Sequence, residues 1–166
     1  RIYFNISIQL STIIGYIMKI PFHKPILPKN LDDIFPDSIR SGWLTTGPMV
    51  KEFETQLSDY LQAEHVIAVN SGTAALHLAL AAKGFQPGDK FIAPTYTFAA
   101  TVEAGEYLGL EPILVDCASD SFNMDLGQVE NILRKEKNIA AVIPVHFSGQ
   151  AVDMERLKLL AVKHGI

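Results

Sequence analysis

The sequence has little cysteine and no concentration of charge of either sign. Cys117 is the single cysteine among 166 residues. One thiol excludes an intrachain disulfide and any metal site built from several cysteines, and it fits a reducing, cytoplasmic compartment. The net charge is −4, with acidic and basic residues mixed along the chain. Because no cluster of Lys and Arg offers a track for phosphates, nucleic acid is not expected as the main partner.

The start of the chain lacks the features of a membrane or targeting segment. Residues 1–17 alternate apolar and polar side chains from Phe4 to Ser11, a strand-like period of two that is too polar for a membrane span. The segment also lacks the basic region and small-residue cleavage site of a signal peptide. Because the chain opens with Arg1 and a methionine follows at Met18, we expect residues 1–17 to be a non-native upstream extension rather than an edge strand. No membrane contact is expected.

What the sequence does contain is an alternation of apolar runs and helical patterns. Helices are expected over 30–40 and from Pro48 onwards, and the second shows an apolar face that we expect to be buried. Short apolar runs then predict strands at residues 65–69, 91–94, 111–116 and 139–145. Helical patterns follow them at about residues 73–83, 99–108, 125–136 and 153–165. Four strands, each followed by a helix, predict an α/β fold with a largely parallel sheet and flanking helices.

The helix start after the first of these runs is rich in hydroxyls and bare backbone, with the sequence Asn70-Ser71-Gly72-Thr73. A helix N-terminus presents unpaired N–H groups and a partial positive charge. Gly72 would let an anion approach the backbone, and Ser71 and Thr73 would add hydroxyl donors, so this turn is a candidate phosphate site. It is neither a Walker loop nor a GxGxxG fingerprint. The alternative is that Ser71 only caps the helix.

An aromatic residue follows the next run, in the segment PTYTF, where Phe98 precedes a predicted helix. A ring just past a strand end can lie flat on a planar cofactor; the alternative is that Phe98 packs in the core. A phosphate site on the neighbouring loop favours the first interpretation, because a phosphorylated aromatic cofactor needs both features close together.

Further candidates follow the strands or lie in loops. His146 has no second ligand at suitable spacing, so no metal site is expected and a polar loop role is favoured. Asp116 is interpreted as a turn or cap residue. Gln150 could bind a substrate or cofactor, or could satisfy loop backbone. Trp43 could contact a substrate or could fill its loop as a hydrophobic plug. The sequence leaves both of these pairs of alternatives open.

Five segments together carry a resemblance to a known family: SGWLTTGPMVKEFE, AVNSGTAALHLAL, PGDKFIAPTYTFAAT, ILVDCASDSFNMD and IPVHFSGQAVDM. In this order they closely resemble the DegT/DnrJ/EryC1/StrS family of PLP-dependent (pyridoxal 5'-phosphate-dependent) sugar aminotransferases. The resemblance runs from Met18 to the end of the chain. Each segment alone would be a weak signal, whereas the ordered set is specific.

The resemblance implies a fold, a reaction and roles for particular residues. The fold would be the type I fold of PLP-dependent transferases, and residues 18–166 would be the N-terminal part of the PLP-binding domain. Gly72 and Thr73 would hold the cofactor phosphate with Ser71 close by, and Phe98 would stack on the pyridine ring. Trp43 and Gln150 would lie near the substrate. The family's usual reaction moves an amino group from glutamate to a keto sugar carried on a nucleotide, typically in a dimer.

The chain departs from the family pattern at its end. No residue here matches the family's aspartate that pairs with the pyridine nitrogen, or the lysine that forms the Schiff base with the cofactor, so we expect no catalytic residue in this chain and no transamination by it alone. We also expect residues 65–69 to lack a neighbouring strand, which would leave the isolated chain prone to aggregation or partial unfolding.

Two other functions stay open at this point. The first is a sugar dehydratase or a non-catalytic regulatory protein on the same PLP fold. The second is a nucleotide-binding module independent of PLP. The missing GxGxxG motif and the lack of an acidic ribose contact after the first helix count against the second alternative.

Overall fold

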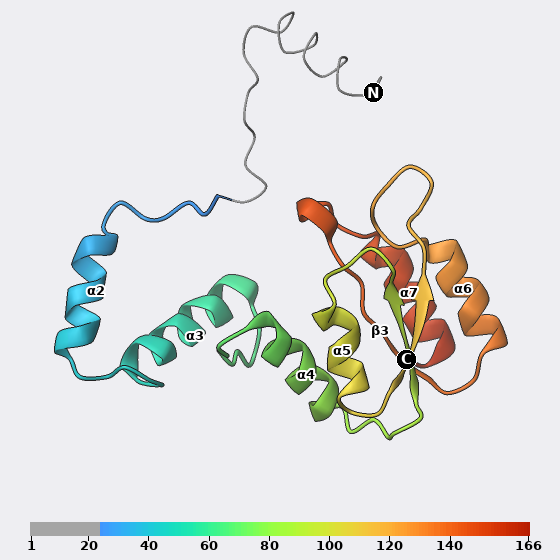
Figure 1. Ribbon diagram of the computed structural model, residues 1–166, viewed down its shortest axis with the longest axis horizontal. Helices are drawn as coiled ribbons and strands as arrows, with labels where there is room; N and C mark the ends of the chain where they lie inside the picture. The colour runs from blue at the N-terminus through green and yellow to red at the C-terminus, as the bar shows by residue number, and fades with distance from the viewer. Residues whose placement is uncertain (1–23) are drawn as a thin grey trace, which may run out of the picture. The chain divides into compact units, whose positions relative to one another are not determined.

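A computed structural model describes residues 24–166, so the expected extension over residues 1–17 lies outside the described residues. The chain divides into two compact units, one ending at Val66 and the other spanning Ile67–Ile166. Figure 1 shows the elements of both. None of the helices within residues 24–166 is long and apolar enough to cross a membrane.

The first unit contains two of the predicted helices, α2 (Leu31–Arg40) and α3 (Pro48–Leu61). Proline opens α3, where its fixed φ suits the first turn and its missing N–H costs nothing. The expectation that α3 buries its apolar face is wrong, because none of its residues is buried and Phe53 and Tyr60 are 55% and 84% exposed. The periodicity shows which face of a helix is apolar; burial also requires a surface that covers this face.

The second unit is built on a three-stranded parallel sheet. Its strands are β1 (Lys90–Pro94), β2 (Glu111–Val115) and β3 (Ile139–Val142), in the order β2-β1-β3. β1 is central and pairs in parallel with both neighbours. The predicted parallel sheet is therefore confirmed for three of the four expected strands.

The prediction of a fourth strand at residues 65–69 is wrong. The structure assigns no strand there, and this segment is not part of the three-stranded sheet. A β conformation is stabilised mainly by ladder hydrogen bonds to a neighbour, so an apolar, β-branched run does not form a strand without one.

Helices flank the sheet on both sides (Figure 1). They are α4 (Gly72–Ala82), α5 (Ala100–Glu106), α6 (Leu126–Lys135) and α7 (Met154–His164), with a short 3₁₀ turn η1 (Phe147–Gly149). Alternate residues of β1 enter two separate cores. Ile92 packs with residues of α6 and α7, whereas Phe91 and Ala93 pack in a second cluster with Leu110. The sheet is thus the middle of three layers, as expected for an α/β fold.

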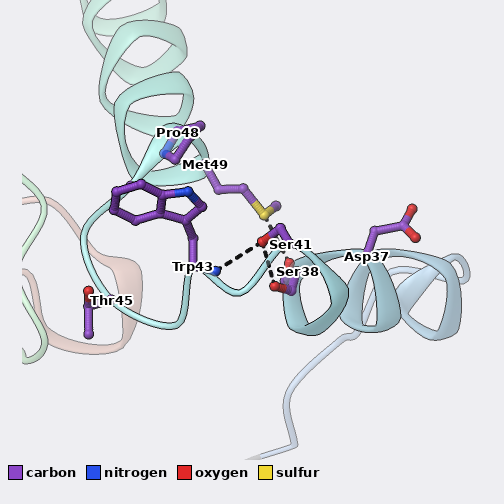
Figure 2. A pocket seen from close by; sticks show the side chains of 8 residues that line it. Asp37, Ser38, Ser41, Trp43, Thr45, Pro48 and Met49 are labelled. Atoms are coloured by element: carbon purple, nitrogen blue, oxygen red, sulfur yellow. Dashed lines mark hydrogen bonds between the residues drawn. The ribbon is translucent and has the colours of Figure 1, made fainter.

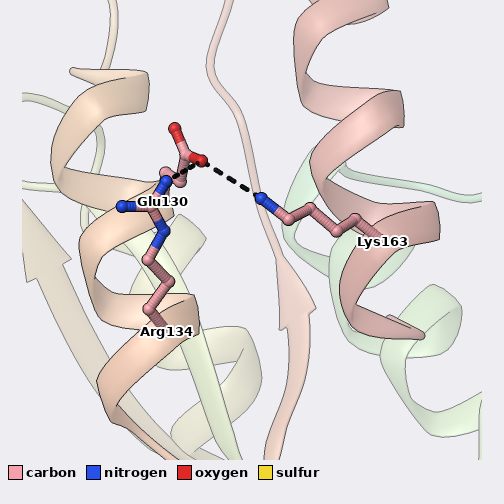
Figure 3. Close-up of polar contacts among 3 residues, drawn as sticks. All are labelled: Glu130, Arg134 and Lys163. Atoms are coloured by element: carbon pink, nitrogen blue, oxygen red, sulfur yellow. Dashed lines mark hydrogen bonds and ion pairs between the residues drawn. The ribbon is translucent and has the colours of Figure 1, made fainter.

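An ionic contact joins α6 to α7 on the outside of the first core (Figure 3). Oε1 of Glu130 accepts hydrogen bonds from Arg134 Nη2 and, at 3.4 Å, from Lys163 Nζ. The hydrogen bond from Arg134 is the main reason that the pKa of Glu130 lies below its ordinary value, and the Lys163 bond adds to it. Because both cations are exposed, water screens these pairs and packing remains the main force between the helices.

The contact between α5 and the sheet depends on a glycine. A Cβ placed on Gly105 would collide with the Phe91 ring, lying 2.6 Å from Cζ, and that ring is fully buried. We predict that Gly105→Ala lowers the free energy of unfolding by about 1–3 kcal/mol, as overpacked cores do. Urea unfolding of the protein measures this change.

Two further variants make that measurement specific. Glu106→Ala changes the exposed neighbour in α5 and should be nearly neutral. Phe91→Leu removes the colliding ring atoms, so Gly105→Ala should cost less in that background. An equal cost in both backgrounds would contradict the predicted collision.

Candidate active site

The start of α4 carries the predicted phosphate-binding residues. Ser71 is the N-cap, and its Oγ accepts a hydrogen bond from the N–H of Ala74 at 3.1 Å. The N–H of Ala75 bonds to the Ser71 carbonyl. Ser71 therefore does cap the helix, as the alternative interpretation proposed. Its hydroxyl pairs the N–H of Ala74, one of the four N–H groups that a helix start leaves open, whereas the Ala75 bond is the first regular bond of the helix.

Of the three open N–H groups that remain, two belong to Gly72 and Thr73, the first two residues of the helix. Among residues 24–166 neither group has a hydrogen-bond partner. Gly72 is exposed, and a Cβ placed on it would meet no atom within 4 Å. The α4 start thus combines two unpaired donors, the positive end of a helix and open space above the backbone, which is what an anion such as a phosphate requires.

The predicted ring-stacking residue lies at the start of α5. Phe98 is 80% exposed, so the alternative that it packs in the core is wrong. It ends the turn that leaves β1, and this turn is anchored where the N–H of Thr95 bonds to the carbonyl of Val115 in β2 at 2.8 Å. The ring therefore presents a large apolar surface at the carboxyl end of the central strand, where ligands bind in open α/β sheets.

The two helix starts lie at the same end of a packed helix pair. α4 and α5 contact each other closely, and the ring centroids of His77 and Tyr107 lie 6.0 Å apart. α5 connects the end of β1 to the start of β2, and the turn after α4 leads into the start of β1, so both helices run back along the sheet. Because His77 lies six residues after the α4 N-cap Ser71 and Tyr107 lies eight residues after the α5 N-cap Ala99, the two starts lie at the same end of the pair, offset by less than about one helical turn.

Gln150 lies in a hollow that sequence reasoning did not identify. Three rings from the loops after three different strands form a cluster: the centroid of Tyr96 lies 5.4 Å from that of Phe122 and 4.8 Å from that of Phe147. The adjoining hollow has a volume of about 660 Å³. Its lining comprises Tyr96, Cys117, Ala118, Ser119, Asp120, Ser121, Phe122 and Gln150. The sequence shows which residues follow each strand, but it does not show that the rings of three loops come together, because this depends on the order of the strands in the sheet.

A buried amide holds the loops around this hollow. The Nδ2 group of Asn123 donates to the carbonyls of Gln150 and Ala151 at 3.0 and 3.1 Å, and its Oδ1 accepts from the N–H of Phe147 at 3.2 Å. Asn123 is only 8% exposed. The backbone at Gln150 is therefore fixed by Asn123, while the Gln150 side chain is exposed and contacts Ser121 Oγ at 3.4 Å.

Trp43 lies in the first unit, in the turn between α2 and α3. It is 60% exposed and lines a hollow of about 390 Å³ (Figure 2). The backbone N–H of Trp43 donates to Ser41 Oγ at 3.2 Å. A Cβ placed on Gly47 would lie 3.0 Å from the ring carbon Cε3 of Trp43. The ring thus packs closely on Gly47 and is still accessible at the hollow, and its substrate contact remains a prediction.

His146 and Asp116 have structural roles, as the sequence favoured. Nδ1 of His146 accepts a hydrogen bond from the N–H of Val152 at 3.1 Å, and Oδ1 of Asp116 accepts from the N–H of Cys117 at 2.7 Å. Within the part of the chain that the structure describes, no three His, Cys, Asp or Glu side chains converge as metal ligands.

Lys90, one of the lysines of the second unit, forms an ion pair. Nζ of Lys90 lies 2.8 Å from Oε2 of Glu136, and this hydrogen bond is the main reason that the pKa of Lys90 lies above its ordinary value. A lysine that acts as a nucleophile needs the opposite shift. Lys90 therefore stabilises the start of β1 against the end of α6.

Comparison with known proteins identifies the class. The DegT/DnrJ/EryC1/StrS aminotransferase family matches residues 27–166, and the chain belongs to this family. The spore coat polysaccharide biosynthesis protein SpsC of Bacillus subtilis (strain 168) is 37% identical over 147 residues, which are 89% of this chain and 37% of SpsC.

Solved structures show the same fold. One is the PLP form of Spr1654 from Streptococcus pneumoniae, described as a candidate sugar aminotransferase, which is 36% identical to this chain with a TM-score of 0.79. The match covers 87% of this chain and 36% of the Spr1654 chain. A GDP-4-keto-6-deoxymannose-3-dehydratase, 21% identical, shares the fold alone, with a TM-score of 0.78 over 86% of this chain and 38% of its own. The predicted PLP-transferase fold is confirmed, and the chain spans a little over a third of the length of these relatives.

We predict that Asn123→Ala lowers the free energy of unfolding by about 1–3 kcal/mol, because it removes the three hydrogen bonds by which the buried Asn123 amide holds the loop around Gln150. Thermal or urea unfolding measures the loss. Asn123→Asp has the same shape and keeps the acceptor for Phe147, yet it loses both donors and should also destabilise. Ser119→Ala, at an exposed position that lines the same hollow, is the matched control. An Asn123→Asp variant as stable as the unaltered protein would contradict this role.

Proposed function

We propose that this chain is the part of a PLP-dependent sugar aminotransferase that holds the phosphate and covers the ring of the cofactor. The observation that carries the proposal is the pair of unpaired N–H groups at Gly72 and Thr73, which lie at the same end of the packed α4–α5 pair as the exposed ring of Phe98. Family membership and the PLP form of Spr1654 support it. The open space over Gly72 and the positive helix end fit a phosphate, and an exposed aromatic face fits a pyridine ring.

Each of these residues has a distinct task. The N–H groups of Gly72 and Thr73 donate to the phosphate, and the Thr73 hydroxyl adds a donor. Ser71 fixes the first turn of α4 by capping it, which keeps those donors aligned. Phe98 covers one face of the ring and excludes water from it. When bound, PLP supplies an electron sink for bonds at the amino-bearing carbon.

The proposed reaction of the whole protein moves an amino group from glutamate to a nucleotide-linked keto sugar in a cytoplasmic homodimer. Trp43 and Gln150 are proposed to contact the sugar nucleotide, since each lines an accessible hollow. Production of 2-oxoglutarate from glutamate, dependent on a nucleotide-linked keto sugar, tests this reaction. Loss of the sugar's hydroxyl as water without uptake of nitrogen would favour a dehydratase instead.

The phosphate site has its own test. We predict that Gly72→Val weakens PLP binding by about tenfold or more, a loss of about 1.4 kcal/mol or more, because the added side chain fills the space above the two donors. The fold should tolerate it, since a Cβ at Gly72 meets no protein atom within 4 Å. Titration with PLP, followed by the absorbance of the cofactor, measures the affinity.

Ala75→Val is the matched control, because it places the same side chain on an exposed position of α4 beyond the first turn. Its PLP affinity should equal that of the unaltered protein. Equal affinities for all three proteins would show that the phosphate binds elsewhere. Strong binding of NAD with no binding of PLP would favour the nucleotide-binding alternative.

A further inference from the structure

The turn that carries Phe98 is held by a pair of threonine hydroxyls, those of Thr97 and Thr101. We propose that Thr101 is a positioning residue that sets the orientation of Phe98 toward the cofactor ring. This inference rests on the proposed function, because it assigns a residue that prepares the same site.

The central observation is a hydrogen bond between two threonines on either side of Phe98. Oγ1 of Thr101 lies 2.8 Å from Oγ1 of Thr97. Thr101 is 6% exposed and belongs to α5, whereas Thr97 is half-buried and precedes the helix. The N–H of Thr101 also bonds to the carbonyl of Phe98 at 3.0 Å. Thr101 therefore holds both Phe98 and the residue before it.

The Phe98 ring has little else to orient it. It is 80% exposed and makes no ring contact with another described residue. The α5 N-cap is Ala99, which has no side chain able to cap the helix. An exposed ring that is not packed must be held through its backbone if it is to meet a ligand without a large loss of conformational entropy.

The other end of the turn is fixed independently. The N–H of Thr95 bonds to the carbonyl of Val115 in β2 at 2.8 Å. The turn is thus anchored to the sheet before Phe98 and to α5 after it. Loss of the hydroxyl bond would weaken the second anchor alone, leaving only its backbone bond from Thr101 to Phe98, and the Phe98 ring would sample more orientations while the sheet remained intact.

The experiment is a PLP titration of the protein, followed by cofactor absorbance and by the circular dichroism induced in the cofactor band. Thr101→Val keeps the shape of the side chain and removes its hydroxyl. We expect PLP affinity to fall about 2- to 10-fold, the range for one lost hydrogen bond, and the induced band to weaken. Thr101→Ser keeps the hydroxyl, so its PLP affinity and induced band should match those of the unaltered protein. Thermal melting without PLP reports stability separately.

The Phe98→Ala background shows whether Thr101 acts through Phe98. Phe98→Ala alone should weaken PLP binding, and adding Thr101→Val should weaken it no further. An equal further loss in that background, or an unchanged affinity of Thr101→Val alone, would overturn the role of Thr101 and leave the proposed function standing. Unchanged PLP affinity in Phe98→Ala itself would overturn both the ring-covering role and this inference.

Discussion

Two backbone N–H groups at the start of α4 are the feature on which the proposed site depends. A helix start leaves four such groups open, and the hydroxyl of Ser71 pairs one of them, the N–H of Ala74. The groups of Gly72 and Thr73 remain, in open space at the positive end of the helix dipole. A cap and an anion site are therefore compatible here, because the cap itself determines which donors stay available.

The sheet explains why this helix start and an aromatic ring lie at the same edge of the fold. In a parallel sheet the helices return along the strands, so every helix begins at the carboxyl edge. The α4 start and the Phe98 turn reach that edge because α4 and α5 pack as neighbours and run in the same direction. Gly105 lets α5 lie close on Phe91 of the central strand, which fixes the depth of the turn. Core packing and the site are thus connected through α5.

Much of the fold could be predicted from local pattern, because helix starts and apolar runs are local properties. α4, α6 and α7 begin within a residue or two of their predicted positions. The failures concern features that need a partner. Residues 65–69 have the composition of a strand, but strand pairing requires a neighbouring strand that the local sequence does not contain. α3 has an amphipathic pattern, but burial of its apolar face requires a covering surface that the local sequence does not contain either.

The same distinction applies to the site. Gly72, Thr73 and Phe98 could be proposed as site residues because a helix start and the end of a strand are recognisable in the local sequence. Asn123 was not, since its bonds reach loops 24 to 28 residues away in the chain. The ring cluster around Tyr96 was missed for a related reason: its rings come from loops that only the strand order β2-β1-β3 brings together.

The most direct test of the account is an experimental structure of the protein with PLP bound. The account predicts that phosphate oxygens lie within hydrogen-bond distance of the N–H groups of Gly72 and Thr73, and that the Phe98 ring lies against one face of the pyridine. A phosphate held by other backbone groups, with Gly72 and Thr73 still facing solvent, would contradict it.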